Sequence, residues 1–329
     1  NKSQCSLEGK MIMRLNIPIL DQIPENSTIL ITGAGGGYDI FSGLPLFFEL
    51  EDLGYDVHLA NFSFSDIVGL YEGEQLSDTL VGVSIDIENY ENYFPEYYLA
   101  EWFFAERNEF VTIWCFEKTG ARPLMQNYRL LTKHLGVDCI ILVDGGVDSL
   151  MRGDEQNAGT LLEDTLSIIA VNEMNNIPFR FLTCIGIGIE YEIDYAHLFE
   201  NISALVKSSS FLGTCSLIQQ MSVFQKYKDA VLYTFKQQPK YPSVICSSLI
   251  SSVHGEYGDY HLTTRTKGSE LRISSLMSMY WFFDLQAVAQ HNHLIQDLKS
   301  TYTIEGAWTK MKQVKTTFTD RATAINPLP

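Results

Sequence analysis

Short apolar runs alternate along the chain with longer segments in which apolar residues recur at helical spacing. The short runs are rich in β-branched and aromatic residues and predict strands at residues 28–32, 56–62, 111–116, 139–143 and 179–185. The periodic segments predict helices at residues 40–53, 94–107, 122–135 and 160–174. Because strands and helices alternate, and several strands are apolar on both faces, the pattern predicts an α/β protein with a doubly wound, mostly parallel sheet and helices on both faces.

The remaining segments are less regular. Residues 64–92 fit neither period and are acidic, which predicts an excursion over the carboxyl edge of the sheet, either a lid or a solvated surface loop. Helices are predicted at 194–208 and 216–236, followed by a two-proline segment at 237–243. We predict next a strand at 244–253 and a mainly buried helix at 271–292, whose aromatic residues 280–283 belong to the core.

These elements suggest a division of the chain near residue 237. Residues 1–237 are expected to form the α/β domain that carries the site. Residues 238–329 are expected to form a helical and β extension packed on the same core, so that the whole chain is a single compact unit.

Charge and cysteine content narrow the choice of partners. A net charge of -17 with only 23 Lys and Arg residues argues against nucleic acid and anionic membranes as partners. A small anionic molecule remains compatible, because backbone N–H groups or a bound cation can neutralise it locally. Six well-separated cysteines, without a CxxC pair or a signal-peptide pattern, lead us to expect a cytoplasmic protein. The sequence leaves the oligomeric state open, and a homo-oligomer is compatible with it.

A glycine-rich loop at residues 33–39 follows the first predicted strand and opens a helix. Glycines let the backbone turn sharply there, and N–H groups at the positive end of a helix can cradle a phosphate or carboxylate. The candidate ligand-binding residues are Gly33, Gly35, Gly36 and Gly37. The alternative is purely structural, with glycines needed only for tight packing between strand and helix.

This loop matches neither standard nucleotide fingerprint. In a dinucleotide-binding GxGxxG motif the third glycine would fall at Tyr38, and the acid that holds the ribose would fall near Asn61. A Walker loop needs a Gly-Lys-Ser/Thr sequence, but no lysine occurs between Lys10 and Lys118.

A second loop, at residues 144–155, follows the fourth predicted strand. Ligands of open α/β sheets bind at the carboxyl ends of strands, so Asp144 and Asp148 are predicted to face the same crevice as the first loop. Such carboxylates can hold Mg²⁺, orient a hydroxyl group or act as a general base, although aspartates also cap helices and form turns. Gly145 and Gly146 are candidate ligand-binding residues because they bring the backbone close to whatever binds. Glu190, after the fifth strand, is a third acid expected at this edge.

His254 and Glu256 form a separate histidine–acid pair. On an extended strand these two residues would share a face and could ligate a metal. The alternative is a glycine-rich loop tip whose polar side chains point to water.

Several of these landmarks occur together in one known family. In chain order they are Gly35-Gly36-Gly37-Tyr38-Asp39, Tyr93-Phe94-Pro95-Glu96 with Trp102, Asp144-Gly145-Gly146-Val147-Asp148, Gly153-Asp154-Glu155, Glu163-Asp164 and Tyr280-Trp281-Phe282-Phe283-Asp284. Through them the chain resembles the largely archaeal and bacterial family catalogued as domain of unknown function 1152. The resemblance implies a Rossmann-like fold and no settled reaction. Val147 departs from the family pattern, which more often has glycine there, and this departure weakens an anion cradle in the second loop.

The leading hypothesis is an enzyme that binds a phosphate- or carboxylate-bearing, nucleotide-like small molecule. A divalent cation such as Mg²⁺ would assist hydrolysis or group transfer. Asp39, Asp144 and Asp148 are expected to hold the cation or activate a nucleophile, and Arg152 to neutralise charge in the transition state. The runner-up is a non-catalytic sensor of a nucleotide or metabolite, and the third hypothesis is a nicotinamide-dependent oxidoreductase.

Overall fold

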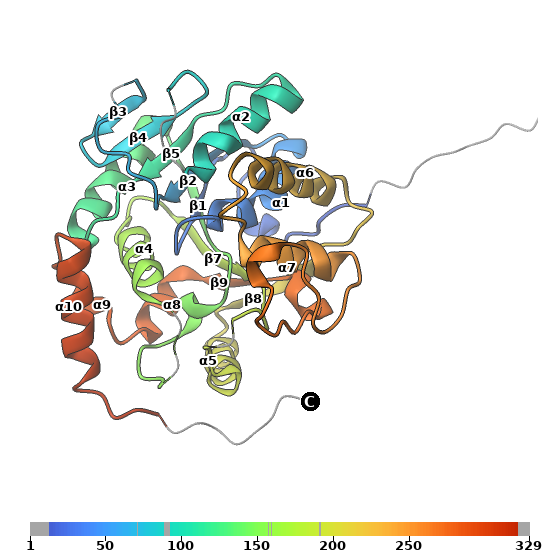
Figure 1. Cartoon of the computed structure of the whole chain (residues 1–329). Coiled ribbons are helices and arrows are strands. Elements are labelled where there is room, and N and C mark those ends of the chain that lie inside the picture. Colours follow the sequence, from blue (N-terminus) through green and yellow to red (C-terminus); the bar gives the residue numbers. More distant parts are fainter. Residues whose placement is uncertain are drawn as a thin grey trace, which may run out of the picture.

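The computed structural model describes residues 13–70, 72–88, 93–156, 158, 160–190 and 192–321. Within these residues a nine-stranded sheet has the order β3-β4-β5-β2-β1-β6-β7-β9-β8. Helices cover the sheet on both sides (Figure 1). The strands are β1 (Thr28–Gly33), β2 (Asp56–Phe62), β3 (Glu74–Ser77), β4 (Leu80–Val83), β5 (Ile113–Phe116), β6 (Cys139–Asp144), β7 (Phe179–Ile185), β8 (Phe211–Ser216) and β9 (Met279–Asp284).

The five central strands, β5-β2-β1-β6-β7, all run parallel. At the edges, β4 pairs antiparallel with β5, and β9 pairs antiparallel with both β7 and β8. The chain winds outward from β1 in one direction through β2 and β5, and in the other through β6 and β7. This arrangement confirms the doubly wound, mostly parallel, Rossmann-like sheet.

Alternation along the strands produces one hydrophobic core on each face of the sheet. In β1, Ile29 and Ile31 belong to one core and Leu30 to the other, as the two-residue period of a strand requires. Helices of the first core are α1 (Asp39–Asp52), α2 (Pro95–Arg107), α6 (Ser222–Gln237) and α7 (Val244–Val253). Helices of the second core are α3 (Ala121–Leu135), α4 (Leu162–Asn172), α5 (Tyr195–Lys207), α8 (Leu285–His291), α9 (Ile295–Leu298) and α10 (Ile304–Lys315).

The predicted strands and the helices between them agree with β1, β2, β5, β6, β7 and α1 to α4 to within two residues at each end. The predicted strand at 244–253 is wrong, because this segment forms helix α7. The Ser243 hydroxyl caps the helix by accepting from the N–H of Cys246. Ser247 and Ser251 donate to carbonyls four residues earlier, which satisfies their hydroxyls within a buried helix and gives an apolar run a helical solution.

The predicted helix at 271–292 is also wrong. Its centre is strand β9, and α8 begins only after Asp284, whose side chain accepts from the N–H of Ala287. Tyr280 and Phe282 enter one core, while Trp281 and Phe283 pack on the other. This two-residue alternation explains why four consecutive aromatic residues can all be placed against the core.

Three further elements differ from the sequence expectation. Strand β8 was not predicted, and the helix expected from residue 216 begins at Ser222. Part of the expected irregular segment at 64–92 forms the β3–β4 hairpin. The C-terminal part of the chain is built into the sheet through β9, which lies between β7 and β8.

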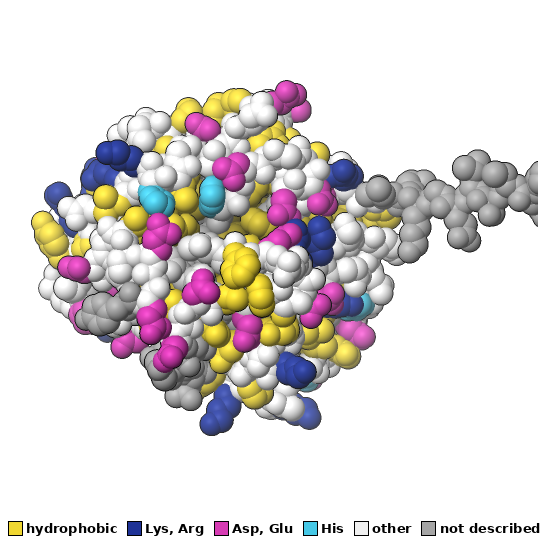
Figure 2. All heavy atoms as spheres, turned by 90° about the horizontal axis from the view of Figure 1, so that it is seen from above, with side chains coloured by type: hydrophobic (Ala, Val, Ile, Leu, Met, Phe, Trp, Pro, Cys, Tyr) yellow, Lys and Arg dark blue, Asp and Glu magenta, His cyan; other side chains and the backbone are white. Residues whose placement is uncertain are grey.

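On the face shown in Figure 2, acidic side chains are spread over the surface, and basic side chains lie mostly towards its margin. Cys115, Cys139, Cys184 and Cys246 are free and buried, and Cys215 is free and partly buried; Cys5 lies outside the described residues. No helix in the described part of the chain is long and apolar enough to cross a membrane.

Candidate functional site

The two glycine- and aspartate-rich loops meet at the point where the strand order reverses. Gly33 at the end of β1 pairs in register with Val143 near the end of β6. Both strands end at the same edge of the sheet, which is where ligands of doubly wound folds bind. A cleft of about 400 Å³ opens there, and both loops line it.

The first loop surrounds Asp39 with backbone N–H groups. The N–H of Gly35 donates to Asp39 Oδ2 at 2.6 Å, and the N–H groups of Gly36 and Gly145 also stabilise this carboxylate. Gly36 has a φ of 95°, and a Cβ there would lie 2.6 Å from the Phe62 carbonyl oxygen. The turn therefore requires glycine, and its amides are directed at a carboxylate of the protein itself.

Glycines of the second loop also allow acidic groups to approach closely. A Cβ on Gly145 would lie 2.9 Å from Asp39 Oδ1, and one on Gly146 would lie 2.9 Å from Glu190 Oε2 and 3.1 Å from Asp144 Oδ1. These glycines leave room for carboxylates to converge on the cleft.

Each predicted acid of this edge is fixed by a hydrogen bond from the backbone. Asp144 Oδ2 accepts from the N–H of Ser149 at 3.1 Å, and Glu190 Oε2 accepts from the N–H of Val147 at 2.8 Å. Asp148 Oδ2 accepts from both the N–H and the hydroxyl of Thr160. The three side chains are held in place before any ligand arrives.

Asp164 was not among the residues predicted for the site. It lies in the first turn of α4, is 3% exposed, and has a buried Oδ1 with no hydrogen-bond partner. Oxygen atoms of Asp39, Asp144 and Asp164 all lie within 4.8 Å of one another. A buried carboxylate without donors is costly to ionise, so either protonation or a bound cation would stabilise this trio.

Burial and mutual repulsion raise the pKa values of these acids. The pKa of Asp39 is raised to about 7, chiefly by burial. The backbone N–H groups that donate to Asp39 lower this pKa, and the charge of Asp148 raises it. For Asp144 and Asp164, burial and then the neighbouring carboxylates raise the pKa well above its ordinary value. The pKa of Glu190 is raised by burial and by the charge of Asp148.

The wall of the cleft is strongly acidic, in agreement with these raised pKa values. Among the described residues, the cleft is lined by six carboxylates and by no Lys, Arg, His or Cys: Gly35, Gly36, Asp39, Phe64, Asp144, Gly145, Asp148, Thr160, Glu163, Asp164, Glu190, Ile245 and Trp308. Oxygen ligands of this kind suit hard divalent cations such as Mg²⁺, Mn²⁺ and Ca²⁺. The arrangement can hold such a cation with carboxylates left over for proton transfer.

Other predicted site residues lie outside the cleft wall. The Arg152 side chain meets His293, with Nη2 3.0 Å from the ring Nε2. A Cβ on Gly33 would lie 2.1 Å from Asn61 Oδ1, so Gly33 permits tight packing. Gly37 borders Tyr93 and Phe64.

The histidine–acid pair does not have the geometry expected for a metal site. His254 is the exposed C-terminal cap of α7, so the extended strand that would align it with Glu256 is absent from this segment. Its ring lies against Phe224. Within the described ranges, the cluster of potential metal ligands is the one formed by Asp39, Asp144 and Asp164.

The structural role of Asn61 was not predicted from the sequence. Its buried amide donates to the Gly37 carbonyl at 2.8 Å and to Glu96 Oε1 at 2.7 Å. Asn61 therefore ties the first loop to α2, at the position where a dinucleotide-binding protein would carry its ribose-binding acid.

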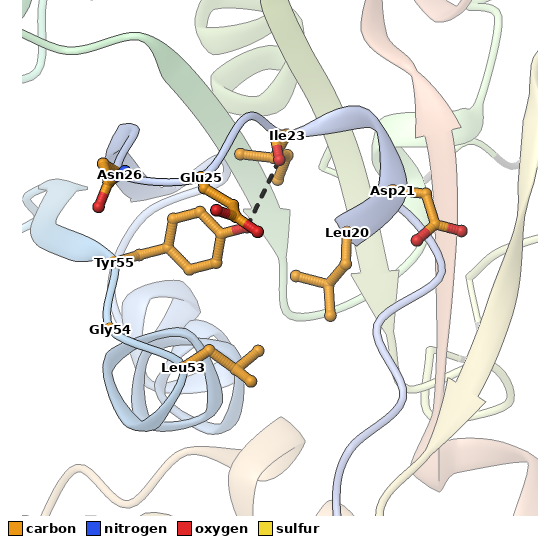
Figure 3. Close-up of a pocket in the computed structure, with 8 residues that line it drawn as sticks. All are labelled: Leu20, Asp21, Ile23, Glu25, Asn26, Leu53, Gly54 and Tyr55. Atoms are coloured by element: carbon orange, nitrogen blue, oxygen red, sulfur yellow. Dashed lines mark hydrogen bonds between the residues drawn. The ribbon is translucent and has the colours of Figure 1, made fainter.

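A larger hollow of about 540 Å³ lies at the opposite edge of the sheet (Figure 3). It is formed by the turns before β1 and between α1 and β2, and the Tyr55 hydroxyl donates there to the Ile23 carbonyl. The side chain of Asp21 points away from the Tyr55 ring (Figure 3). Since this hollow lies at the amino end of the parallel strands, the smaller acidic cleft at their carboxyl end is the better candidate.

Comparison with known proteins places the chain in a family. No curated protein and no solved structure matches it. A family model does match residues 104–319, which is more than half of the chain and includes Asp144, Asp164 and Trp308. The protein therefore belongs to the family described as "Protein of unknown function (DUF1152)".

Proposed function

We propose that the protein binds a divalent cation through Asp39, Asp144 and Asp164 and uses it to act on a phosphate- or carboxylate-bearing small molecule, as a hydrolase or transferase. The observation that carries this proposal is the Asp164 carboxylate, buried and without a hydrogen-bond donor on Oδ1, beside two other carboxylates. A divalent cation would supply the missing positive charge.

The cation also accounts for how an anionic molecule could enter so acidic a cleft. The N–H groups of Gly35, Gly36 and Gly145 are engaged with Asp39, so the cation is the group left to receive an incoming phosphate or carboxylate. Binding of the anion by the glycine loop itself stays a prediction, and the cation provides the stronger electrostatic attraction.

The chemistry that such a cation supplies is polarisation of a phosphoryl or carbonyl oxygen and acidification of a bound water. Residues of this chain would position that water and accept its proton. Asp148 and Glu190 have the geometry for this role, because each is oriented by a backbone N–H and lines the cleft. Arg152, whose side chain contacts His293, is not part of this proposal.

Calorimetric titration with Mn²⁺ tests the proposal. Wild-type protein should bind the ion, and Asp164→Asn should weaken binding by at least about tenfold, since a charged ligand is lost. Asp21→Asn is the matched control, because Asp21 is an exposed aspartate at the opposite edge of the sheet. Absence of binding by wild type, or equal effects of the two substitutions, would remove the proposal. Cation binding without turnover of phosphate esters or nucleotides would favour the sensor.

A further inference from the structure

Two exposed aromatic side chains stand in the wall of the acidic cleft. Trp308 on α10 is 45% exposed, and Phe64 after β2 is 40% exposed. Large aromatic side chains are usually buried in the core. Exposed aromatic rings beside polar groups often mark a binding surface. The aromatic pair has no part in holding the cation, so it calls for a separate explanation.

A lysine accompanies each of these rings. The Lys312 ammonium lies 4.8 Å from the centre of the Trp308 ring. The Lys118 ammonium donates to the Phe64 carbonyl and lies 5.8 Å from that ring. The cleft therefore has carboxylates on its walls and ammonium groups beside its aromatic residues.

We infer that the small molecule brought to the cation is a nucleotide, with its base stacked on Trp308 and its phosphates between the cation and Lys118. This inference rests on the proposed function and identifies its ligand class. A nucleotide combines a planar ring with a polyanion, which is the complement of an indole, an ammonium group and a cation. The cleft volume of about 400 Å³ lies in the range of small-molecule sites.

Competing ligand classes fit these features less well. A phosphate ester without a ring would leave Trp308 in water. A polyamine would suit the carboxylates, but Lys118 and Lys312 would repel it where it passes the aromatic residues. The lysines therefore favour a ligand whose outer part is anionic.

The test uses two kinds of probe, with and without a nucleoside, and both kinds resist hydrolysis at the phosphorus bridge. These are α,β-methylene-ADP with its guanosine counterpart, and methylenediphosphonate, each titrated calorimetrically in the presence of Mn²⁺. Trp308→Ala should weaken nucleotide binding by about 5- to 100-fold, as expected for the loss of one base–aromatic stack. It should leave the affinities for Mn²⁺ and for methylenediphosphonate unchanged. Trp308→Phe should retain much of the nucleotide affinity, and Tyr257→Ala, at an exposed aromatic residue that does not line the cleft, should have no effect.

The outcomes separate this inference from the proposed function. Mn²⁺ binding with no nucleotide binding, equal losses for both probes in Trp308→Ala, or preferential binding of a polyamine would overturn the nucleotide assignment and leave the cation site standing. Failure to bind Mn²⁺ would overturn the proposed function itself. A selective loss of nucleotide affinity in Trp308→Ala, recovered in Trp308→Phe, would support the assignment.

Discussion

Replacing Glu96 by glutamine should make the protein less sensitive to pH. Glu96 is fully buried on α2, where one carboxylate oxygen accepts from Asn61 and the other has no partner. Burial raises its pKa from the ordinary 4.5 to about 7, against the lowering effect of the hydrogen bond from Asn61. The folded state therefore holds the proton more tightly than the unfolded state does.

The sign and size of the effect follow from this shift. The contribution of Glu96 to stability should be largest below the unfolded pKa and should be lost as the pH rises from 4.5 towards 7, because ionising the buried carboxyl favours unfolding. At about 1.4 kcal/mol per pKa unit, the contribution of Glu96 amounts to about 3 kcal/mol. The glutamine side chain of the variant would keep an oxygen that can accept from Asn61 but would not ionise.

Urea unfolding followed by tryptophan fluorescence, at several pH values from 4.5 to 8, measures the effect. The difference in free energy of unfolding between Glu96→Gln and wild type should move in favour of the variant by about 3 kcal/mol across this range. Other titrating groups are common to both proteins and largely cancel. Glu106→Gln, on the exposed side of the same helix, is the control and should show no such trend. A difference that stays constant with pH would refute the reasoning.

Three further predictions concern the loops and the C-terminal segment. Gly36→Val should lower the free energy of unfolding by at least about 2 kcal/mol, because of its positive φ and close backbone contact; unchanged urea unfolding would count against this. Arg321→Met should lower the free energy of unfolding by about 3 kcal/mol, since it leaves the buried Glu155 carboxylate without its charge partner. A loss below about 1 kcal/mol would show that the backbone N–H groups suffice to stabilise this carboxylate. Asp39→Asn and Asp144→Asn should be non-additive in Mn²⁺ affinity by about 1 kcal/mol or more, because both hold one ion; strict additivity would place them in separate sites.

The central part of the fold was predictable because each strand there has an unambiguous local signal. The run at β6 is apolar on both faces and ends at Asp144 followed by two glycines. Such a run can only be buried between two helical layers. The same logic failed for α7 and β9, since short apolar segments suit a helix or a strand equally well. In α7 the serine hydroxyls donate to carbonyls of the same helix. In β9 the tertiary contacts decide, because this segment pairs with both β7 and β8.

The site was predictable where its residues lie at strand ends or in the loops that follow them. Asp144 and Glu190 follow apolar strands, so the carboxyl-edge rule brings them to one cleft. Asp164 carries no such signal, because an acid in the first turn of a helix is ordinary and favours the helix dipole. Asp164 stands out only in the folded structure, where it is buried. Its helix is held against the first loop, because Ser167 donates to the Ala34 carbonyl. Trp308 is likewise brought to the cleft by α10, far along the chain.

Anomalous diffraction from crystals grown with Mn²⁺ tests the central claim most directly. The claim predicts a manganese peak bounded by Asp39, Asp144 and Asp164, with carboxylate oxygens about 2.1 Å from the ion, and loss of that peak in Asp164→Asn. A peak elsewhere on the protein with none between these three carboxylates, or a peak that persists unchanged in Asp164→Asn, would contradict it.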